Sequence, residues 1–163
     1  MVREVGWIIE SVERVLRANP LQVSRVLNFK TGTTVYSRTE LLMHPENGLI
    51  GQAYTALREA WFGEHSDRLI VIQYEKLARD PRGVLKLLYQ LLGEPWFEHD
   101  FDNVEFDEPD YDADLGVPGL HKVRPSVKFE ERRPFIPPDI FAKYANAAFW
   151  LRPEENPTRA TII

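Results

Sequence analysis

Apolar residues recur at three- and four-residue spacing in the first twenty positions of the chain. Val5, Ile9 and Val12 belong to this series, and glutamates and arginines fall between them. Such spacing places the apolar side chains on one face of a helix. The pattern therefore predicts an amphipathic helix that begins at Val5 and ends near Asn19-Pro20.

The same periodicity continues along the chain. It predicts four further helices: a short one from Ser37 or Arg38 to Met43, one over 49–62 that is stopped by Gly63, one that opens at Asp80-Pro81 and is capped by Gly93, and one after Pro137-Pro138. Residues 35–38 themselves show no strong helix face.

One segment has a different pattern. Residues 68–74 contain the run Leu69-Ile70-Val71-Ile72 and end at Tyr74. Consecutive branched apolar residues are typical of a strand buried on both faces, as in a parallel sheet. Met1-Val2-Arg3 is interpreted as the end of another strand that leads into the first helix. Alternation of helix and buried strand predicts an α/β fold, with residues 1–163 as a single domain.

Composition narrows the class of protein. The chain has 163 residues, 44% of them apolar, and a net charge of −5. Disorder is excluded as the default, and bulk nucleic-acid binding is disfavoured because it needs a basic footprint. The absence of cysteine excludes disulfides, thiolate zinc sites and cysteine nucleophiles. No apolar run approaches the roughly 20 residues that span a bilayer, and no signal peptide is visible, so we expect a cytoplasmic protein.

Charges are unevenly distributed in the second half of the chain. Residues 98–114 are acidic, whereas residues 122–133 are basic. Asp110, Asp112 and Asp114 have the spacing of the first three ligands of a calcium loop, but Leu115 and His121 stand where such a loop needs glycine and glutamate. We therefore predict a solvated acidic loop and no metal site. The four histidines, His44, His65, His99 and His121, show no metal-ligand spacing and are expected at the surface or at caps.

Arg3 and Ser11 form the first candidate site. Arg3 ends the predicted strand stub, and Ser11 lies eight residues later in the following helix. The junction of a strand end and a helix is where α/β proteins bind ligands, and the arginine fork matches two phosphate oxygens. The pair suits a phosphate monoester. The alternative is that Arg3 pairs with a carboxylate and Ser11 is an ordinary helix residue.

A longer pattern supports the phosphate interpretation. Residues 69–77 end in Tyr74-Glu75-Lys76-Leu77, and a leucine-rich helix then runs from Asp80-Pro81 to Leu92-Gly93. This order resembles the tyrosine-glutamate segment of sulfotransferases. In that family an earlier strand ends in Val-Arg-Asp and a serine follows eight residues after the arginine, which Val2-Arg3-Glu4 and Ser11 match except for Glu4. Residues 119–150 are similar to the end of bacterial members.

The resemblance implies a fold and a reaction. The fold would be the C-terminal part of a helix-rich, P-loop nucleotide-binding three-layer sandwich. The reaction would be sulfuryl transfer from 3′-phosphoadenylyl sulfate to a hydroxyl or amine, with adenosine 3′,5′-bisphosphate as product and no metal. Arg3 and Ser11 would hold the 3′-phosphate, and Tyr74 would lie near the adenine. One of three basic residues would close over the phosphate as a lid: Lys122, Arg124 or Arg133. The alternative for this basic run is a solvated face.

The chain also departs from the family pattern. In the family, the 5′-phosphosulfate loop and the usual base precede the Val-Arg strand. We therefore expect a truncated domain that lacks its N-terminal strand and this loop, and no catalytic residue is assigned. Lys30-Thr31-Gly32-Thr33-Thr34 resembles such a phosphate loop, but it follows the Arg3 unit and lacks a preceding buried strand. The alternative is a turn in an acceptor-side loop.

Three classes of function remain open. The first is a sulfotransferase acting on a small-molecule or peptide acceptor, without nucleic-acid or membrane partners. The second is a non-catalytic fragment or module that binds a nucleotide or a protein partner, as a homo-oligomer or through an exposed sheet edge. The third is an unrelated phosphotransferase, disfavoured because a Walker lysine motif is absent.

Overall fold

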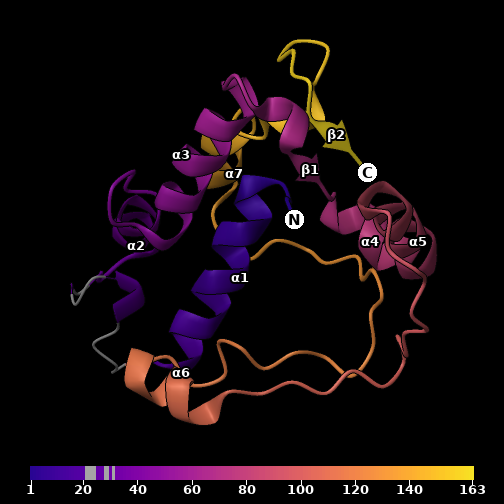
Figure 1. Cartoon of the computed structure of the whole chain (residues 1–163). Helices are drawn as coiled ribbons and strands as arrows, with labels where there is room; N and C mark the ends of the chain where they lie inside the picture. The colour runs from indigo at the N-terminus through magenta and orange to yellow at the C-terminus, as the bar shows by residue number, and fades with distance from the viewer. Residues whose placement is uncertain (21–24, 28–29, 31) are drawn as a thin grey trace.

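The computed structural model describes residues 1–20, 25–27, 30 and 32–163. Within them the chain is rich in helix and forms a small parallel sheet (Figure 1). The helices are α1 (Val5–Ala18), α2 (Val35–Leu42), α3 (Leu49–Phe62), α4 (Tyr74–Arg79), α5 (Pro81–Leu92), α6 (Pro109–Leu115) and α7 (Pro138–Tyr144). The short 3-10 turns are η1 (Arg25–Leu27), η2 (Ser66–Arg68) and η3 (Phe149–Leu151), and the strands are β1 (Ile70–Val71) and β2 (Thr161–Ile162).

The sheet is built around residues 69–73. β1 pairs in parallel with β2, with Ile70 opposite Thr161. On the other side of this segment Val2 forms an isolated parallel bridge with Gln73. Two main-chain bonds of 2.8 Å, Val2 N–H to the Ile72 carbonyl and Tyr74 N–H to the Val2 carbonyl, hold this bridge. The parallel arrangement predicted for the buried run is therefore confirmed, and the Met1–Arg3 stub lies where a strand would.

The strand is shorter than the predicted range of 68–74. Arg68 ends η2, and Tyr74 begins α4 instead of ending the strand. Its partners are equally short, so the ladder stops after a few bonds and the chain turns into a helix. The α/β class is thus confirmed in its coarse form, helices around parallel strands. The three-layer sandwich stays a prediction.

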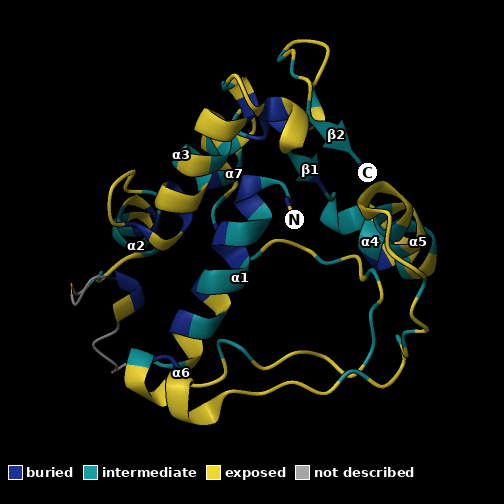
Figure 2. Ribbon diagram, in the orientation of Figure 1, coloured by how far each residue is buried: buried dark blue, intermediate teal, exposed yellow. Residues whose placement is uncertain are grey.

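The core lies where α1, α3 and the C-terminal segment meet. Ile9, Leu42 and Trp61 are completely buried. The indole N–H of Trp61 donates to the Asn156 carbonyl at 3.0 Å, and the Thr158 hydroxyl donates to the Trp61 carbonyl at 2.8 Å. These bonds attach the segment that precedes β2 to the end of α3. Dark-blue residues alternate with teal and yellow ones along α1 in Figure 2, so part of the surface of this helix contributes to the interior.

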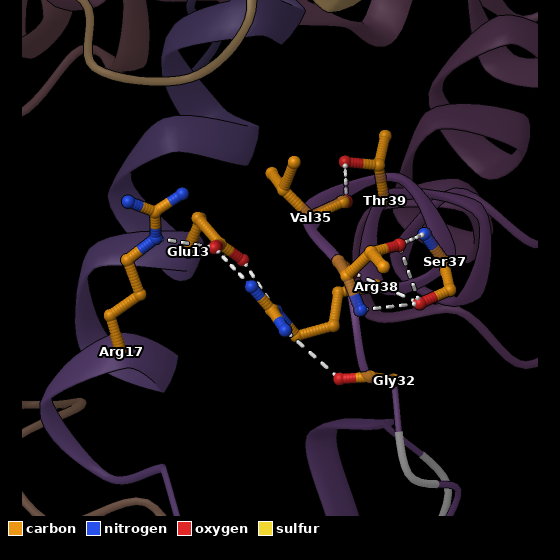
Figure 3. A network of polar contacts seen from close by, with 8 residues as sticks. Glu13, Arg17, Gly32, Val35, Ser37, Arg38 and Thr39 are labelled. Atoms are coloured by element: carbon orange, nitrogen blue, oxygen red, sulfur yellow. Dashed lines mark hydrogen bonds and ion pairs between the residues drawn. The ribbon is translucent and has the colours of Figure 1, made fainter.

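A buried ion pair joins α1 to α2. Glu13 is 1% exposed, and its carboxylate accepts hydrogen bonds from Arg38 Nε at 2.8 Å and Nη2 at 2.5 Å (Figure 3). Arg17 Nε on the same helix adds a third bond at 2.7 Å. Arg38 Nη1 also donates to the Gly32 carbonyl at 2.9 Å. Burial by itself would raise the pKa of Glu13, but the bonds and charges of Arg38 and Arg17 outweigh it, so the pKa lies below its ordinary value.

The start of α2 differs from its prediction, whereas the limits of α5 are confirmed. α2 begins at Val35, because Thr34 and Ser37 form a reciprocal capping box, so the absence of a strong helix face over 35–38 was a wrong guide. α5 has the predicted limits, with Asp80 as N-cap and Gly93 in the left-handed conformation, but none of its side chains is fully buried. Leu91 and Leu92 are exposed, so within the described chain the leucine face of this helix does not reach the core.

The predicted acidic loop is also partly wrong. Residues 109–115 form α6, and Asp112 within it is 0% exposed. The sequence did not predict α6 because aspartates at alternate positions, 110, 112 and 114, do not have the three- and four-residue spacing of an amphipathic helix. Only one of the three is buried, and it is buried because it has a partner within the fold.

We predict that Arg38→Met lowers the free energy of unfolding by about 2 kcal/mol, because the buried Glu13 carboxylate loses two hydrogen bonds and keeps the one from Arg17. Urea unfolding at neutral pH measures this change. Arg58→Met is the matched control, since Arg58 is exposed on α3. Equal stability of the two variants would contradict a structural role for the pair.

The same pair predicts an acid dependence. The pKa of Glu13 is lower in the folded chain than its ordinary value of 4.5. Its contribution to stability is therefore fully present above that value and is lost as the pH falls through the folded-state pKa. Thermal unfolding of the wild type and of Arg38→Met between pH 7 and the acid limit should show the two melting temperatures converging in acid. Parallel curves would count against this assignment.

Candidate functional site

Arg3 lies at the junction of the sheet and α1. Its guanidinium carbon is 4.5 Å from the centre of the Tyr74 ring and 5.5 Å from that of Trp7. The main-chain bonds between Val2 and Tyr74 place these residues together, because they bring the end of the first strand segment beside the start of α4. Two of the sequence-predicted site residues, Arg3 and Tyr74, are therefore in contact.

The Arg3 side chain borders a cavity of about 430 Å³. The cavity lies between α1, the start of α4 and residues 129–132, and Trp7 and Arg132 are also in its lining. Its size is within the ordinary range of small-ligand pockets. Carboxylates of Glu4, Glu75, Glu130 and Glu131 also line it, so its two arginines are surrounded by acidic groups.

The Arg3 Nε atom is buried without a hydrogen-bond partner in the described chain. Glu75 Oε1 is the nearby anion, at 3.4 Å, which makes an ion pair of long geometry. The Arg3 side chain is 16% exposed and that of Glu75 is 35% exposed. A buried guanidinium N–H without a well-placed acceptor is an unmet donor, and an anion in the cavity would satisfy it.

Ser11 lies one helical turn beyond Trp7 on α1. Its hydroxyl donates to the Trp7 carbonyl at 2.9 Å, a common arrangement of a helical serine. Ser11 is not in the lining of the Arg3 cavity as the described residues define it. The structure therefore brings Arg3 and Tyr74 together, and places Ser11 further along the same helix with its proton already donated.

Phe135 fixes the segment that closes the cavity. Its ring lies against the guanidinium groups of Arg14 and Arg17 on α1, with carbon-to-centroid distances of 4.7 and 4.8 Å. This contact attaches Phe135 to α1, and Arg132, three residues earlier, is in the lining of the cavity that Arg3 borders. Arg132 was missed in the sequence because a run of charged residues carries no signal of which one turns inward.

The three predicted lid residues lie elsewhere. Lys122 lines a separate shallow cavity with Glu105 and Asp107. Arg124 forms an ion pair with Glu130, and this contact lowers the pKa of the Glu130 carboxyl. Arg133 is exposed. Of the basic run, the residue in the lining of the Arg3 cavity is Arg132, and a lid role for the other three stays a prediction.

The acidic and basic segments run side by side. Val104 N–H donates to the Pro125 carbonyl at 2.7 Å, and Val127 N–H donates to the Phe101 carbonyl at 2.8 Å. A third bond of 3.2 Å joins Val123 N–H to the Phe106 carbonyl. Figure 1 shows these long segments passing beneath α1, between α5 and α6. The opposite charges of the two segments therefore partly neutralise each other.

The described residues of the loop that resembles a phosphate loop, 32–34, form the turn that leads into α2. The Thr34 hydroxyl accepts the Ser37 N–H at 3.1 Å, and the Gly32 carbonyl accepts from Arg38. The preceding described residues, 25–27, form the 3-10 turn η1 and not a strand. Thr31, Phe29 and the stretch from 21 to 24 lie outside the described residues. The groups that are described favour the alternative of a turn at the entry to a helix.

The family described as "Sulfotransferase domain" matches residues 23–108, just over half of the chain. The chain belongs to this family. The matched range includes Tyr74 and excludes Arg3, Ser11 and the basic segment. No curated protein matches the chain, and no solved structure matches it either.

Two searches of the described residues gave negative results. No group of three or more His, Asp or Glu side chains lies where it could hold a metal ion in the described part of the chain. Over the same residues, none of the helices has both the length and the apolar character needed to cross a membrane.

We predict slow amide exchange at Val104 and Val127 relative to their neighbours Glu105 and Lys128, because only the first two donate across the segment pair. Hydrogen exchange followed by NMR measures these rates. Uniformly fast exchange over 101–127 would show that the acidic and basic segments do not pair in solution.

Proposed function

We propose that this chain is the nucleotide-binding part of a sulfotransferase, and that Arg3 binds the 3′-phosphate of 3′-phosphoadenylyl sulfate. The observation that carries the proposal is the Arg3 guanidinium, stacked on Tyr74 beside a cavity, with its Nε buried and unbonded. Membership of the sulfotransferase family supplies the reaction: transfer of a sulfuryl group to a hydroxyl or amine acceptor.

The support for a phosphate comes from the arginines of the cavity, because the four glutamates in its lining oppose an anion. A guanidinium donates two parallel hydrogen bonds to two oxygens of one phosphate, and the Tyr74 ring beneath keeps the guanidinium plane in place. Arg132 is a second cation in the lining. The Trp7 ring, which is in the cavity lining, offers an aromatic surface to an adenine next to the phosphate, whereas Tyr74 is outside that lining and lies against the Arg3 guanidinium.

Binding requires an exchange of partners. Glu75 pairs with Arg3 at 3.4 Å, and a dianionic phosphate at the same guanidinium would replace this carboxylate. The exchange is favourable because a phosphate accepts the Nε proton in good geometry, whereas Glu75 does not. Ser11 would join the phosphate only if its hydroxyl left the Trp7 carbonyl. When bound, the co-substrate supplies the sulfuryl group, and these residues orient its 3′ end.

A non-catalytic nucleotide-binding module is the second candidate. It is favoured by the loop at 32–34, whose Thr34 hydroxyl caps α2 and is therefore engaged with this helix instead of a phosphosulfate. Turnover of 3′-phosphoadenylyl sulfate in the presence of an acceptor distinguishes the two candidates.

Calorimetric titration with adenosine 3′,5′-bisphosphate tests the phosphate site. We expect binding that 5′-AMP does not reproduce, and we expect Arg3→Ala to weaken it by about 1.5–3 kcal/mol, the usual worth of a hydrogen bond to a charged group. Arg58→Ala, an exposed arginine on α3, is the control and should bind as the wild type does. Equal binding of 5′-AMP, or an Arg3→Ala variant with unchanged affinity, would refute the assignment.

Glu75→Gln gives an independent prediction of opposite sign. Removing the competing carboxylate frees Arg3, so affinity for adenosine 3′,5′-bisphosphate should rise up to about fivefold, in line with the small worth of partly exposed ion pairs. The same titration measures it, with Glu59→Gln on the exposed face of α3 as control. Weaker binding in Glu75→Gln than in the control would mean that Glu75 assists the ligand and does not compete with it.

A further inference from the structure

A histidine-carboxylate pair lies outside the Arg3 cavity. Asp112 Oδ1 is 2.5 Å from His121 Nδ1, and Asp112 Oδ2 accepts the main-chain N–H of His121 at 2.9 Å. Both oxygens of the buried carboxylate are therefore directed to one residue. The His121 side chain is 38% exposed, so the pair connects the interior with the surface.

Local backbone geometry builds this pair. α6 ends at Gly116, and the chain reverses through Gly116 and Gly119, which have φ angles of 70° and 82°. Both angles are in the left-handed region that glycine tolerates best. Val117 between them is buried, and the Asn19 side chain at the end of α1 donates to the Pro118 carbonyl at 3.2 Å. The turn is thus anchored at two points, and His121 returns over Asp112.

The pairing determines what the imidazole presents to solvent. Burial would raise the pKa of Asp112, but the hydrogen bonds and charge of His121 outweigh it, and the pKa lies below its usual range. An ionised carboxylate at Nδ1 requires a proton on that nitrogen. In the neutral ring Nε2 then carries the lone pair and accepts hydrogen bonds. Nε2 has no protein partner in the described part of the chain.

His121 lines a cavity of about 290 Å³ between α6, η1 and the start of α3. Its other polar lining groups are Arg25, Asn47, Gln52 and Tyr111. The Tyr111 side chain is 55% exposed, and its ring is 5.4 Å from that of His121. No carboxylate is in the lining within the described residues. The cavity thus combines an aromatic ring with hydrogen-bond donors and acceptors. Its charged side chain is the cation Arg25.

We propose that this cavity binds a neutral polyhydroxylated molecule, a sugar in chemical class, with His121 Nε2 accepting a hydroxyl proton. An ammonium ligand is disfavoured because Arg25 would repel it and no carboxylate in the lining would pair with it. The amides of Asn47 and Gln52 each donate and accept, as vicinal hydroxyls require. The Tyr111 ring offers an apolar face to a sugar ring.

This inference rests on the proposed function, because it makes the sugar part of the acceptor. Arg3 precedes α1, whereas the His121 turn contacts the residue after its last turn, Asn19. A 14-residue helix is about 21 Å long. His121 therefore holds a part of the acceptor remote from the nucleotide's 3′-phosphate. The acceptor hydroxyl at His121 is a recognition group, and no proton transfer is assigned to it.

NMR of the full chain tests the site with two probes. Long-range ¹H–¹⁵N spectra should show that the neutral form of the His121 ring carries its proton on Nδ1 and has an unprotonated Nε2. Cellobiose should shift the Nε2 resonance. The control is deacetylated chitobiose, a disaccharide with the same two rings as cellobiose but with ammonium groups. It should leave the Nε2 resonance unshifted at the same concentration.

Surface variants keep the test independent of folding, since Asp112 is buried and its replacement risks the turn. We expect Gln52→Ala and Tyr111→Ala to weaken cellobiose binding about fivefold each, the ordinary worth of one net contact. Tyr36→Ala is the matched control, because Tyr36 is 50% exposed on α2 and is not in this cavity's lining. Asp112→Asn should move the proton from Nδ1 to Nε2, which a purely structural role would not require.

The outcomes separate this inference from the proposed function. A protonated Nε2 in the neutral wild-type ring, an unshifted Nε2 with cellobiose, or equal binding of the amino sugar would overturn the sugar site. Equal losses in Tyr36→Ala and Tyr111→Ala would also overturn it. Adenosine 3′,5′-bisphosphate is titrated into the same sample. If cellobiose binds and the nucleotide does not, the sugar site is retained and the nucleotide site fails; the reverse result rejects the sugar site alone.

Discussion

The buried contact between Glu13 and Arg38 is the constraint on which the rest of the structure depends. A carboxylate that is 1% exposed in the middle of α1 has to be paired, and its partner comes from α2. The same arginine binds the Gly32 carbonyl, so one side chain fixes the helix and its entry turn. α1 in turn positions both candidate sites. Arg3 precedes its first turn, and Asn19 after its last turn holds the segment that leads to His121.

Both candidate sites use a carboxylate to control a cationic or basic group. At one end of α1, Glu75 pairs with Arg3 at long distance and leaves Nε unbonded. At the other end, Asp112 binds His121 closely and orients its ring. The first pairing is long and partly exposed, whereas the second has a fully buried carboxylate. The proposed phosphate site would therefore need an exchange of partners, whereas the proposed sugar site would use a histidine that is already oriented.

Much of the helical structure and the family could be predicted from the sequence. Helices over 5–18, 49–62 and 81–92 follow from apolar periodicity and from caps such as Asp80, which are local signals. Pairing across long separations could not be predicted. The burial of Asp112 depends on a residue nine positions later and on two left-handed turns between them. The same distinction applies to the candidate site. Arg3 could be predicted from its position after a strand, which is a local signal, whereas Arg132 could not.

The sequence by itself determined the α/β class, the main helices and the resemblance to sulfotransferases, because local spacing encodes backbone conformation and family motifs are read in order. The tertiary structure decided which charged residues meet. Arg132 is in the lining of the Arg3 cavity and Arg133 is exposed, in a segment whose Phe135 lies against two arginines of α1. Adjacent residues of one charged run have equal local signals. Contacts between this segment and the distant helix α1 distinguish them, because tertiary packing sets which side of the segment faces the helix.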